Sequence, residues 1–207
     1  MGTALSCPPT PPQELIWNFK PEKYNMPNYR RSRISGGTFF FTVVTFRRRP
    51  ILDLPASRQA LRDAIIDVRE RYPFSIDAWV TLPEHLHCIW TLPEESSDFS
   101  LRWALIKSGF SKRARALFQI KDWKNDSKLK HRESTIWQRR FWEHQIRNEE
   151  EYQAYMDYIH YNPVKHGYVN KVLDWPHSTF YRYVKLGTYP ENWGGIVTET
   201  IGRDFGE

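Results

Sequence analysis

The chain has 207 residues, of which 40% are hydrophobic, so it is long enough for one domain with a sizeable core and short appendages. Its net charge of +6 and its 9 Trp, 11 Tyr and 12 Phe favour a polyanionic partner with bases that can stack, namely unpaired nucleic acid. A plain basic globular domain is the alternative. The sequence shows no membrane-spanning run, signal-peptide core or cysteine framework, so we expect a cytoplasmic protein that lies on the nucleoid if it binds DNA.

The N-terminal region combines prolines with arginines. Six prolines within the first 27 residues predict an arm without regular structure. Arg30, Arg31 and Arg33 follow, and three arginines ahead of the Gly36-Gly37 turn can bind phosphates or base edges, although a solvated basic loop explains them equally well. The expected division of the chain is an arm over 1–27, a domain over 28–185 and a C-terminal tail over 186–207.

In the first half of the domain, the sequence predicts strands that alternate with helices. Runs of β-branched and aromatic residues predict the strands, and apolar residues at helical spacing predict the helices. The expected elements are a strand over 38–46, a helix over 57–71 with Ser57 as its cap, strands over 74–82 and 85–92, and a helix over 100–118. The short link Pro83-Glu84 joins the second and third strands as an antiparallel hairpin.

The expected helix over 100–118 has a basic outer surface. Its apolar residues form a stripe at helical spacing, which we expect to face the core. Lys107, Lys112 and Arg113 fall away from this stripe. Residues 119–134, which follow the helix, are charged and polar and predict an exposed insertion.

A fourth strand and a third helix complete the domain. The strand is expected over 136–148, where aromatic and polar residues alternate. Asn148 with Glu151 three residues later has the pattern of a capping box, so a helix should begin there. We expect this helix to end at Asn162-Pro163, because proline disfavours helical backbone in the residue before it. The aromatic tail beyond it is expected to pack against the domain.

The strand over 85–92 carries two histidines that can act together. Successive side chains of a strand point to opposite faces, so His85 and His87 share one face while Leu86 and Cys88 share the other. Two imidazoles side by side can chelate one metal ion. Histidine-x-histidine in a strand is more often structural, however, and the pair needs a third ligand and a reactive group to form a catalytic site.

Tyr158 and Asn162 supply both groups. They are four residues apart in the third helix, and so lie on one face, beside its apolar stripe rather than inside it. If the helix packs along the histidine strand, Asn162 completes a metal site for Mg²⁺ or Mn²⁺, which suit a phosphate substrate, while zinc stays compatible with the ligand types. Tyrosine attack on a phosphodiester would give a reversible phosphotyrosyl link. From the residues alone, Tyr155 and Tyr161 rank equally with Tyr158.

Several sequence blocks resemble the REP-associated tyrosine transposases, a branch of the single-tyrosine HUH transposases that act on single-stranded DNA. The main blocks are PEHLHCIWTLPE at 83–94, RFWEHQIRN at 140–148 and DYIHYNPVKHGYV at 157–169, and shorter matches lie at 29–43 and 174–184. Their order and spacing are consistent with the family. The resemblance implies that His85 and His87 are the two HUH histidines, Tyr158 the nucleophile and Asn162 the metal-binding amide. The proline-rich arm and the 119–134 insertion depart from the family pattern.

The resemblance also implies a fold and a substrate. The fold would be α+β, with an antiparallel four- to five-stranded sheet and packed helices, of the ferredoxin or RRM-like HUH nuclease type. The partner would be single-stranded DNA with a REP hairpin and a flanking tetranucleotide, cleaved by a monomer through a 5′-phosphotyrosine intermediate with Mg²⁺ or Mn²⁺. The residues expected to contact this DNA are Arg30, Arg31, Arg33, Lys107, Lys112, Arg113, Arg139, Arg140 and Lys165.

Two other functions stay open at this point. A protein that binds REP hairpins without transposing them would keep the fold and lack metal-dependent nicking. A zinc hydrolase would turn over without a covalent adduct. His160, between Tyr158 and Asn162, is a candidate proton shuttle, although a position facing solvent fits it better.

Overall fold

The computed structural model describes residues 34–118 and 135–194. The predicted proline-rich arm, the polar insertion and the basic residues Arg30, Arg31 and Arg33 lie outside the described residues. Within the described ranges, no helix combines the length and the apolar character needed to cross a membrane.

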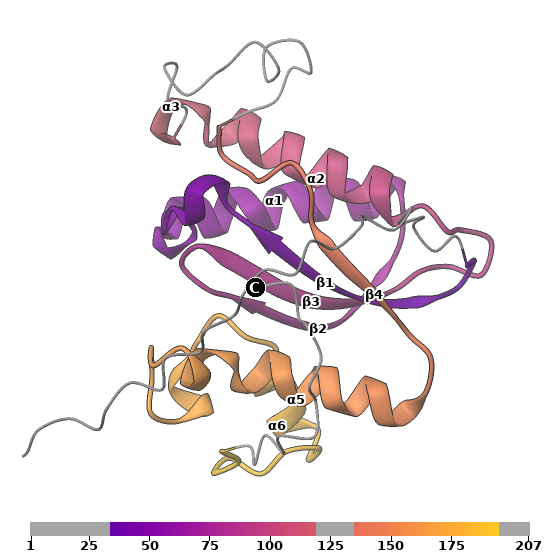
Figure 1. The fold of residues 1–207 in the computed structure, drawn as a ribbon, viewed down its shortest axis with the longest axis vertical. Coiled ribbons are helices and arrows are strands. Elements are labelled where there is room, and N and C mark those ends of the chain that lie inside the picture. Colours follow the sequence, from indigo (N-terminus) through magenta and orange to yellow (C-terminus); the bar gives the residue numbers. More distant parts are fainter. Residues whose placement is uncertain (1–33, 119–134, 195–207) are drawn as a thin grey trace, which may run out of the picture. The chain divides into compact units, whose positions relative to one another are not determined.

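A four-stranded antiparallel sheet with the strand order β2-β3-β1-β4 forms the centre of the fold (Figure 1). The strands are β1 (Thr38–Val44), β2 (Ser75–Thr81), β3 (His85–Thr91) and β4 (Trp142–Ile146). The predicted hairpin is confirmed, since β2 and β3 pair directly on either side of Pro83-Glu84. With α1 after β1 and α2 after β3, the chain follows the β-α-β-β-α-β order of ferredoxin-like folds, which confirms the α+β prediction.

Helices cover both faces of the sheet. The longer ones are α1 (Pro55–Arg71), α2 (Phe99–Arg113) and α5 (Glu149–Lys165), and the shorter ones are α3 (Arg115–Phe118) and α6 (Phe180–Lys185). Short 3₁₀ turns lie at Phe46–Arg48, Ile51–Asp53 and Val172–Asp174. Figure 1 shows α1 and α2 on one face of the sheet and α5 on the other.

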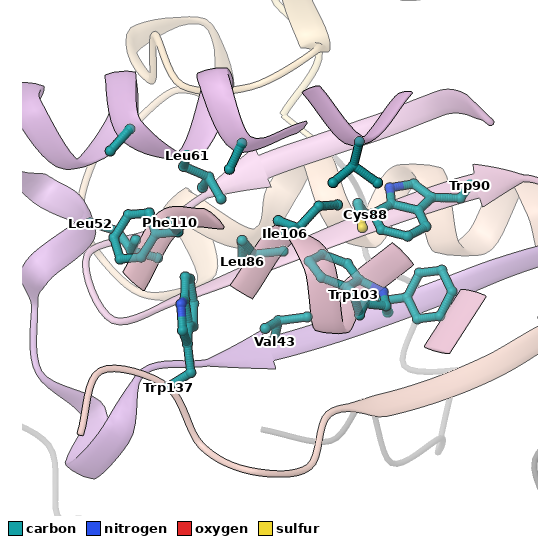
Figure 2. Packing of buried hydrophobic residues seen from close by; sticks show 14 of the residues in the cluster. Val43, Leu52, Leu61, Leu86, Cys88, Trp90, Trp103, Ile106, Phe110 and Trp137 are labelled. Atoms are coloured by element: carbon teal, nitrogen blue, oxygen red, sulfur yellow. The ribbon is translucent and has the colours of Figure 1, made fainter. Parts of the chain in front are cut away.

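Each face of the sheet has its own apolar core. On the α1 and α2 face, Phe41 and Trp90 pack with Trp103, whose ring stacks on that of Trp90 at 4.3 Å between centroids (Figure 2). On the α5 face, Phe40 and Ile89 pack with residues of α5 such as Tyr155. A strand buried on both faces needs apolar residues at successive positions, which explains the nearly uninterrupted apolar run of β1.

The structure corrects several predicted boundaries in the first half of the chain. The first strand ends at Val44 rather than at residue 46. Ser57 is not a cap: it is buried inside α1, which begins at Pro55, where the missing N–H of proline costs nothing. The second helix begins at Phe99, because the Asp98 carboxylate accepts a hydrogen bond from the Leu101 amide at 2.8 Å, and it is interrupted after Arg113.

The predicted start of α5 is confirmed, and its predicted end is wrong. The Asn148 side chain accepts a hydrogen bond from the Glu151 amide at 2.7 Å. The helix then continues through Pro163 to Lys165. Gly167 ends it in left-handed conformation with φ +71°, and the amide of Tyr168 donates to the Pro163 carbonyl at 3.0 Å. This final turn keeps α5 regular past Asn162.

The fourth strand is shorter than predicted, and the aromatic tail packs as expected. Regular β4 pairing begins only at Trp142, and Trp137 contributes an isolated bridge to Thr45. Beyond α5, Val172, Phe180 and Tyr189 form a third apolar cluster. The predicted division of the chain at residues 27 and 185 stays a prediction.

Candidate active site

His85 and His87 lie side by side on the face of β3 that α5 covers. Their ring centroids are 4.8 Å apart, and both side chains are fully buried. Leu86 and Cys88 point into the core on the opposite face, as the alternation predicted. Burial in that core raises the pKa of the Cys88 thiol well above its usual value, and the thiol lies on the wrong face to join the histidines.

Both imidazoles are oriented through Nδ1. The Nδ1 atom of His85 lies 2.9 Å from Oε1 of Glu84, and that of His87 lies 2.9 Å from Oγ1 of Thr42, its register partner on β1. The hydrogen bond with His85 holds the pKa of the Glu84 carboxyl at about 2. Contacts of this kind set the tautomer of a histidine and leave Nε2 as the ligand atom. Within the described residues, Nε2 of His85 makes no hydrogen bond.

Helix α5 places Tyr158 against this pair. The Tyr158 ring lies 5.3 Å from the His87 ring and 6.0 Å from that of Phe40, edge-on to both. The Lys165 ammonium donates a hydrogen bond to the Tyr158 hydroxyl at 3.2 Å and lies 4.9 Å from the centre of the ring. The reactive oxygen of the phenol therefore has a cation next to it.

Asn162 lies one helical turn from two residues that contact the histidines. Tyr158, Asn162 and His166 follow each other at four-residue spacing, and the His166 ring lies 5.3 Å from that of His85. Because Tyr158 contacts His87 and His166 contacts His85, α5 runs antiparallel to β3 and carries Asn162 along the pair. The side chain of Asn162 is fully buried, and its Oδ1 makes no hydrogen bond within the described part of the chain.

The position predicted for Tyr158 beside the apolar stripe was wrong. Tyr158 is only 5% exposed and belongs to the apolar cluster on this face, and Asn162 is 0% exposed. His166 was not among the predicted site residues, although its spacing of four residues from Asn162 was a usable signal.

The structure distinguishes Tyr158 from the neighbouring tyrosines. Tyr155 packs on Phe40 and His144, with ring centroids 4.6 and 5.1 Å away. Tyr161 packs against the third apolar cluster. Among the tyrosines of α5, the one whose ring is placed against the His85 and His87 pair is therefore Tyr158.

The donor atoms that converge here fit a divalent cation. In the described ranges, no group of three His, Cys, Asp or Glu side chains could hold a metal ion. The buried Oδ1 of Asn162 is a further candidate oxygen ligand on the side of α5 that faces the histidines. Two imidazole nitrogens and one amide oxygen, without thiolate, suit Mg²⁺, Mn²⁺ or Zn²⁺ by ligand type, and a phosphate substrate favours the first two.

The basic residues predicted to contact DNA are distributed over both faces. Lys112 and Arg113 lie on α2, across the sheet from Tyr158, and Arg113 forms an ion pair with Asp67 at 2.6 Å. Lys107 does not belong to the outer surface as predicted: it is half-buried and donates to the Gln138 carbonyl at 2.5 Å.

The remaining basic candidates lie on other parts of the fold. Arg139 and Arg140 are exposed just before β4. Among the predicted residues that the structure describes, Lys165 is the one that lies next to Tyr158.

His160 occupies the opposite side of α5 and does not face solvent. Its ring is fully buried against Phe180 and Tyr189, and its Nε2 lies 3.0 Å from the Thr179 hydroxyl. Burial lowers the pKa of His160 to about 3. A neutral side chain that joins α5 to the C-terminal segment is a structural element rather than a proton shuttle.

Known proteins are similar to this chain in both sequence and fold. The chain is 51% identical over 174 residues to the REP-associated tyrosine transposase of Escherichia coli strain K12, and the aligned region covers 84% of this chain and 94% of that protein. It is 44% identical over 181 residues to a Haemophilus influenzae protein provisionally given the same name, covering 87% of this chain and all of that protein. A solved structure of a REP-associated tyrosine transposase bound to a REP hairpin superposes with a TM-score of 0.71 at 50% identity, covering 84% of this chain and 94% of that one. No protein-family profile matches the chain.

Proposed function

Because the chain belongs to the REP-associated tyrosine transposases, we propose that it cleaves and rejoins single-stranded DNA beside REP hairpins with Tyr158 as the nucleophile. The observation that carries this assignment is the contact of the Tyr158 ring with His87, next to His85 on the same strand. A solved relative at 50% identity is bound to a REP hairpin, which supports the same class of substrate for this chain.

The reaction exchanges one phosphate ester for another. The Tyr158 oxygen attacks the scissile phosphorus and forms a new O–P bond, while the bond between phosphorus and the 3′ oxygen of the preceding nucleotide breaks. The phenol gives up its proton and the departing 3′ oxygen gains one, which leaves a 5′-phosphotyrosine and a free 3′-hydroxyl. Attack by a 3′-hydroxyl reverses the step, so the strand can be rejoined without an external energy source.

Lys165 and Glu84 support this chemistry in different ways. The Lys165 ammonium, 3.2 Å from the Tyr158 oxygen, stabilises negative charge on that oxygen and on a phosphate beside it. Glu84 holds the His85 ring through Nδ1 and thereby directs Nε2. Lys165 thus supplies positive charge to the site, and Glu84 fixes the orientation of a histidine, before DNA binds.

His85, His87 and Asn162 would hold Mg²⁺ or Mn²⁺. Such a cation, when bound, neutralises charge on the phosphate oxygens and orients the ester for in-line attack. We propose that the protein recognises the nucleotides that flank the hairpin, including a tetranucleotide, and that these nucleotides determine which DNA sequence is cleaved. We also propose that the protein acts as a monomer.

The test uses REP-hairpin oligonucleotides, labelled at the 5′ or the 3′ end, with Mg²⁺ or Mn²⁺ on a denaturing gel. The expected result is a covalent protein–DNA adduct that requires the cation and is absent in Tyr158→Phe. Tyr161→Phe is the matched control, because it removes a hydroxyl from the same helix on a side that faces another cluster. An adduct that persists in Tyr158→Phe refutes the assignment of Tyr158 as the nucleophile. Hairpin binding without an adduct, across several flanking tetranucleotides, would instead indicate a REP-binding protein that does not transpose.

A further inference from the structure

A groove lies along the β2 edge of the sheet, away from the cluster of Tyr158 and the histidines. Its volume is about 500 Å³, and it is lined by one side of α1, by β2 and by residues of the segment before and within α6. Four arginines line it, Arg58, Arg62, Arg69 and Arg182, and its lining includes no carboxylate. A groove with this charge suits an anionic ligand.

Most of the hydrogen bonds of these arginines are to backbone carbonyls. Arg69 donates to the Phe74 carbonyl at 3.1 Å, and Arg182 donates to the Ile76 carbonyl at 3.2 Å. Arg58 also lies 3.7 Å from the carboxylate of Asp53, outside the lining. Arg62 is exposed, and the described residues offer it no hydrogen bond or ion pair. These contacts hold guanidinium groups in place, while Asp53 beside Arg58 and Asp77 near Arg182 offset part of the positive charge.

Apolar side chains lie between the arginines. Ile66 is 48% exposed on α1, and Ile65 and Trp79 are half-buried beside it. The Trp79 indole is oriented by a hydrogen bond of 2.8 Å from its Nε1 to the Thr81 hydroxyl. Apolar surface between fixed positive charges suits a strand whose bases are unpaired, because such bases can rest on it while the phosphates meet the arginines.

The groove and the histidines lie on opposite faces of the sheet. Thr81 lines it, and the register partner of Thr81 is Leu86, whose side chain faces the α1 and α2 core on the opposite side of the sheet from His85 and His87. Trp175 covers this end of β2, donating from Nε1 to the Thr81 carbonyl at 3.0 Å. A DNA strand that extends from the histidine site would therefore reach the groove by passing around the β2 edge of the sheet, past the residues that pair with β2 there.

We propose that this groove binds unpaired DNA that flanks the hairpin, an inference that rests on the proposed single-strand transferase function. The duplex stem of the hairpin would be bound elsewhere. The groove then contributes affinity for the flank through phosphate contacts and apolar contacts with bases.

The test compares Arg62→Gln with Arg71→Gln. Both substitutions remove one positive charge from an exposed position of α1, but Arg71 does not line the groove. Fluorescence anisotropy would measure the affinity of each full-length protein for a REP hairpin with and without a single-stranded flank, over a series of salt concentrations. We expect Arg62→Gln to weaken binding of the flanked hairpin about fivefold, to reduce the salt slope by about 0.7, and to leave the bare hairpin unchanged. Arg71→Gln should match the unmodified protein.

Three outcomes would overturn the proposal: equal losses in both variants, an equal loss for the flanked and bare hairpins, or no loss in Arg62→Gln. The adduct assay on the same oligonucleotides separates this proposal from the catalytic one. A Tyr158-dependent adduct without any flank effect of Arg62 would refute the groove alone. A flank effect of Arg62 without any adduct would refute the strand transfer and leave the groove as a DNA-binding site.

Discussion

Acid should destabilise this protein through His160. The ordinary pKa of histidine is 6.5, and burial lowers that of His160 in the folded protein to about 3. Between these values the unfolded chain takes up a proton that the folded chain does not, so the stabilisation present above pH 6.5 is lost as the pH falls. At pH 5 the gap of 1.5 units below the unfolded value corresponds to about 2 kcal/mol of lost unfolding free energy.

The assay is urea unfolding at pH 7.5 and pH 5, in the unmodified protein and in His160→Gln. The amide of glutamine can still reach the Thr179 hydroxyl, and it does not titrate in this range, so the variant reports the contribution of all other groups. The difference in pH dependence between the two proteins should be about 2 kcal/mol. If both lose the same free energy of unfolding, His160 is not held neutral by burial and the reasoning fails.

Two further predictions concern the candidate active site. Glu84→Ala removes the carboxylate that holds His85 and should weaken Mn²⁺ binding, measured by calorimetry, by about 10- to 100-fold. Glu94→Ala, which removes an exposed carboxylate from the turn beyond the other end of β3, serves as the control, and equal affinities would show that Glu84 does not orient the ligand. Lys165→Gln should slow formation of the covalent adduct by at least about tenfold in single-turnover kinetics, because the cation beside the Tyr158 oxygen is lost. Lys171→Gln, which removes an exposed positive charge beyond α5, should leave the rate unchanged, and a full rate in Lys165→Gln would contradict the assigned role.

Local rules predicted much of the fold correctly. Alternation along a strand placed His85 and His87 on one face and Cys88 on the other, because that relation depends only on backbone geometry. The β2–β3 hairpin and the Asn148 cap were predicted for the same reason, since each depends on residues close together in the chain. The blocks that resemble the family led to the site residues that the residue types had already suggested, His85, His87, Tyr158 and Asn162. Their catalytic roles stay a proposal.

Pro163 and Gly167 show where local rules failed. Proline predicted the end of α5 at Asn162, but the helix continues because packing on the sheet and the left-handed turn at Gly167 offset the one hydrogen bond that proline cannot make. Ser57 likewise has the residue type of a cap and is buried inside α1. Propensities of single residues are small compared with the packing of a whole helix.

Contacts between distant segments could be found only in the folded chain. Helical spacing groups Tyr158, Asn162 and His166 on one face but does not say which surface that face meets, and residue type alone left Tyr155 and Tyr161 equally eligible as nucleophiles. The packing of α5 antiparallel to β3 places Tyr158 on His87 and His166 on His85, across more than seventy residues of sequence. Periodicity describes one element at a time, whereas an active site is a relation between elements, and that relation is set by which apolar faces are buried together.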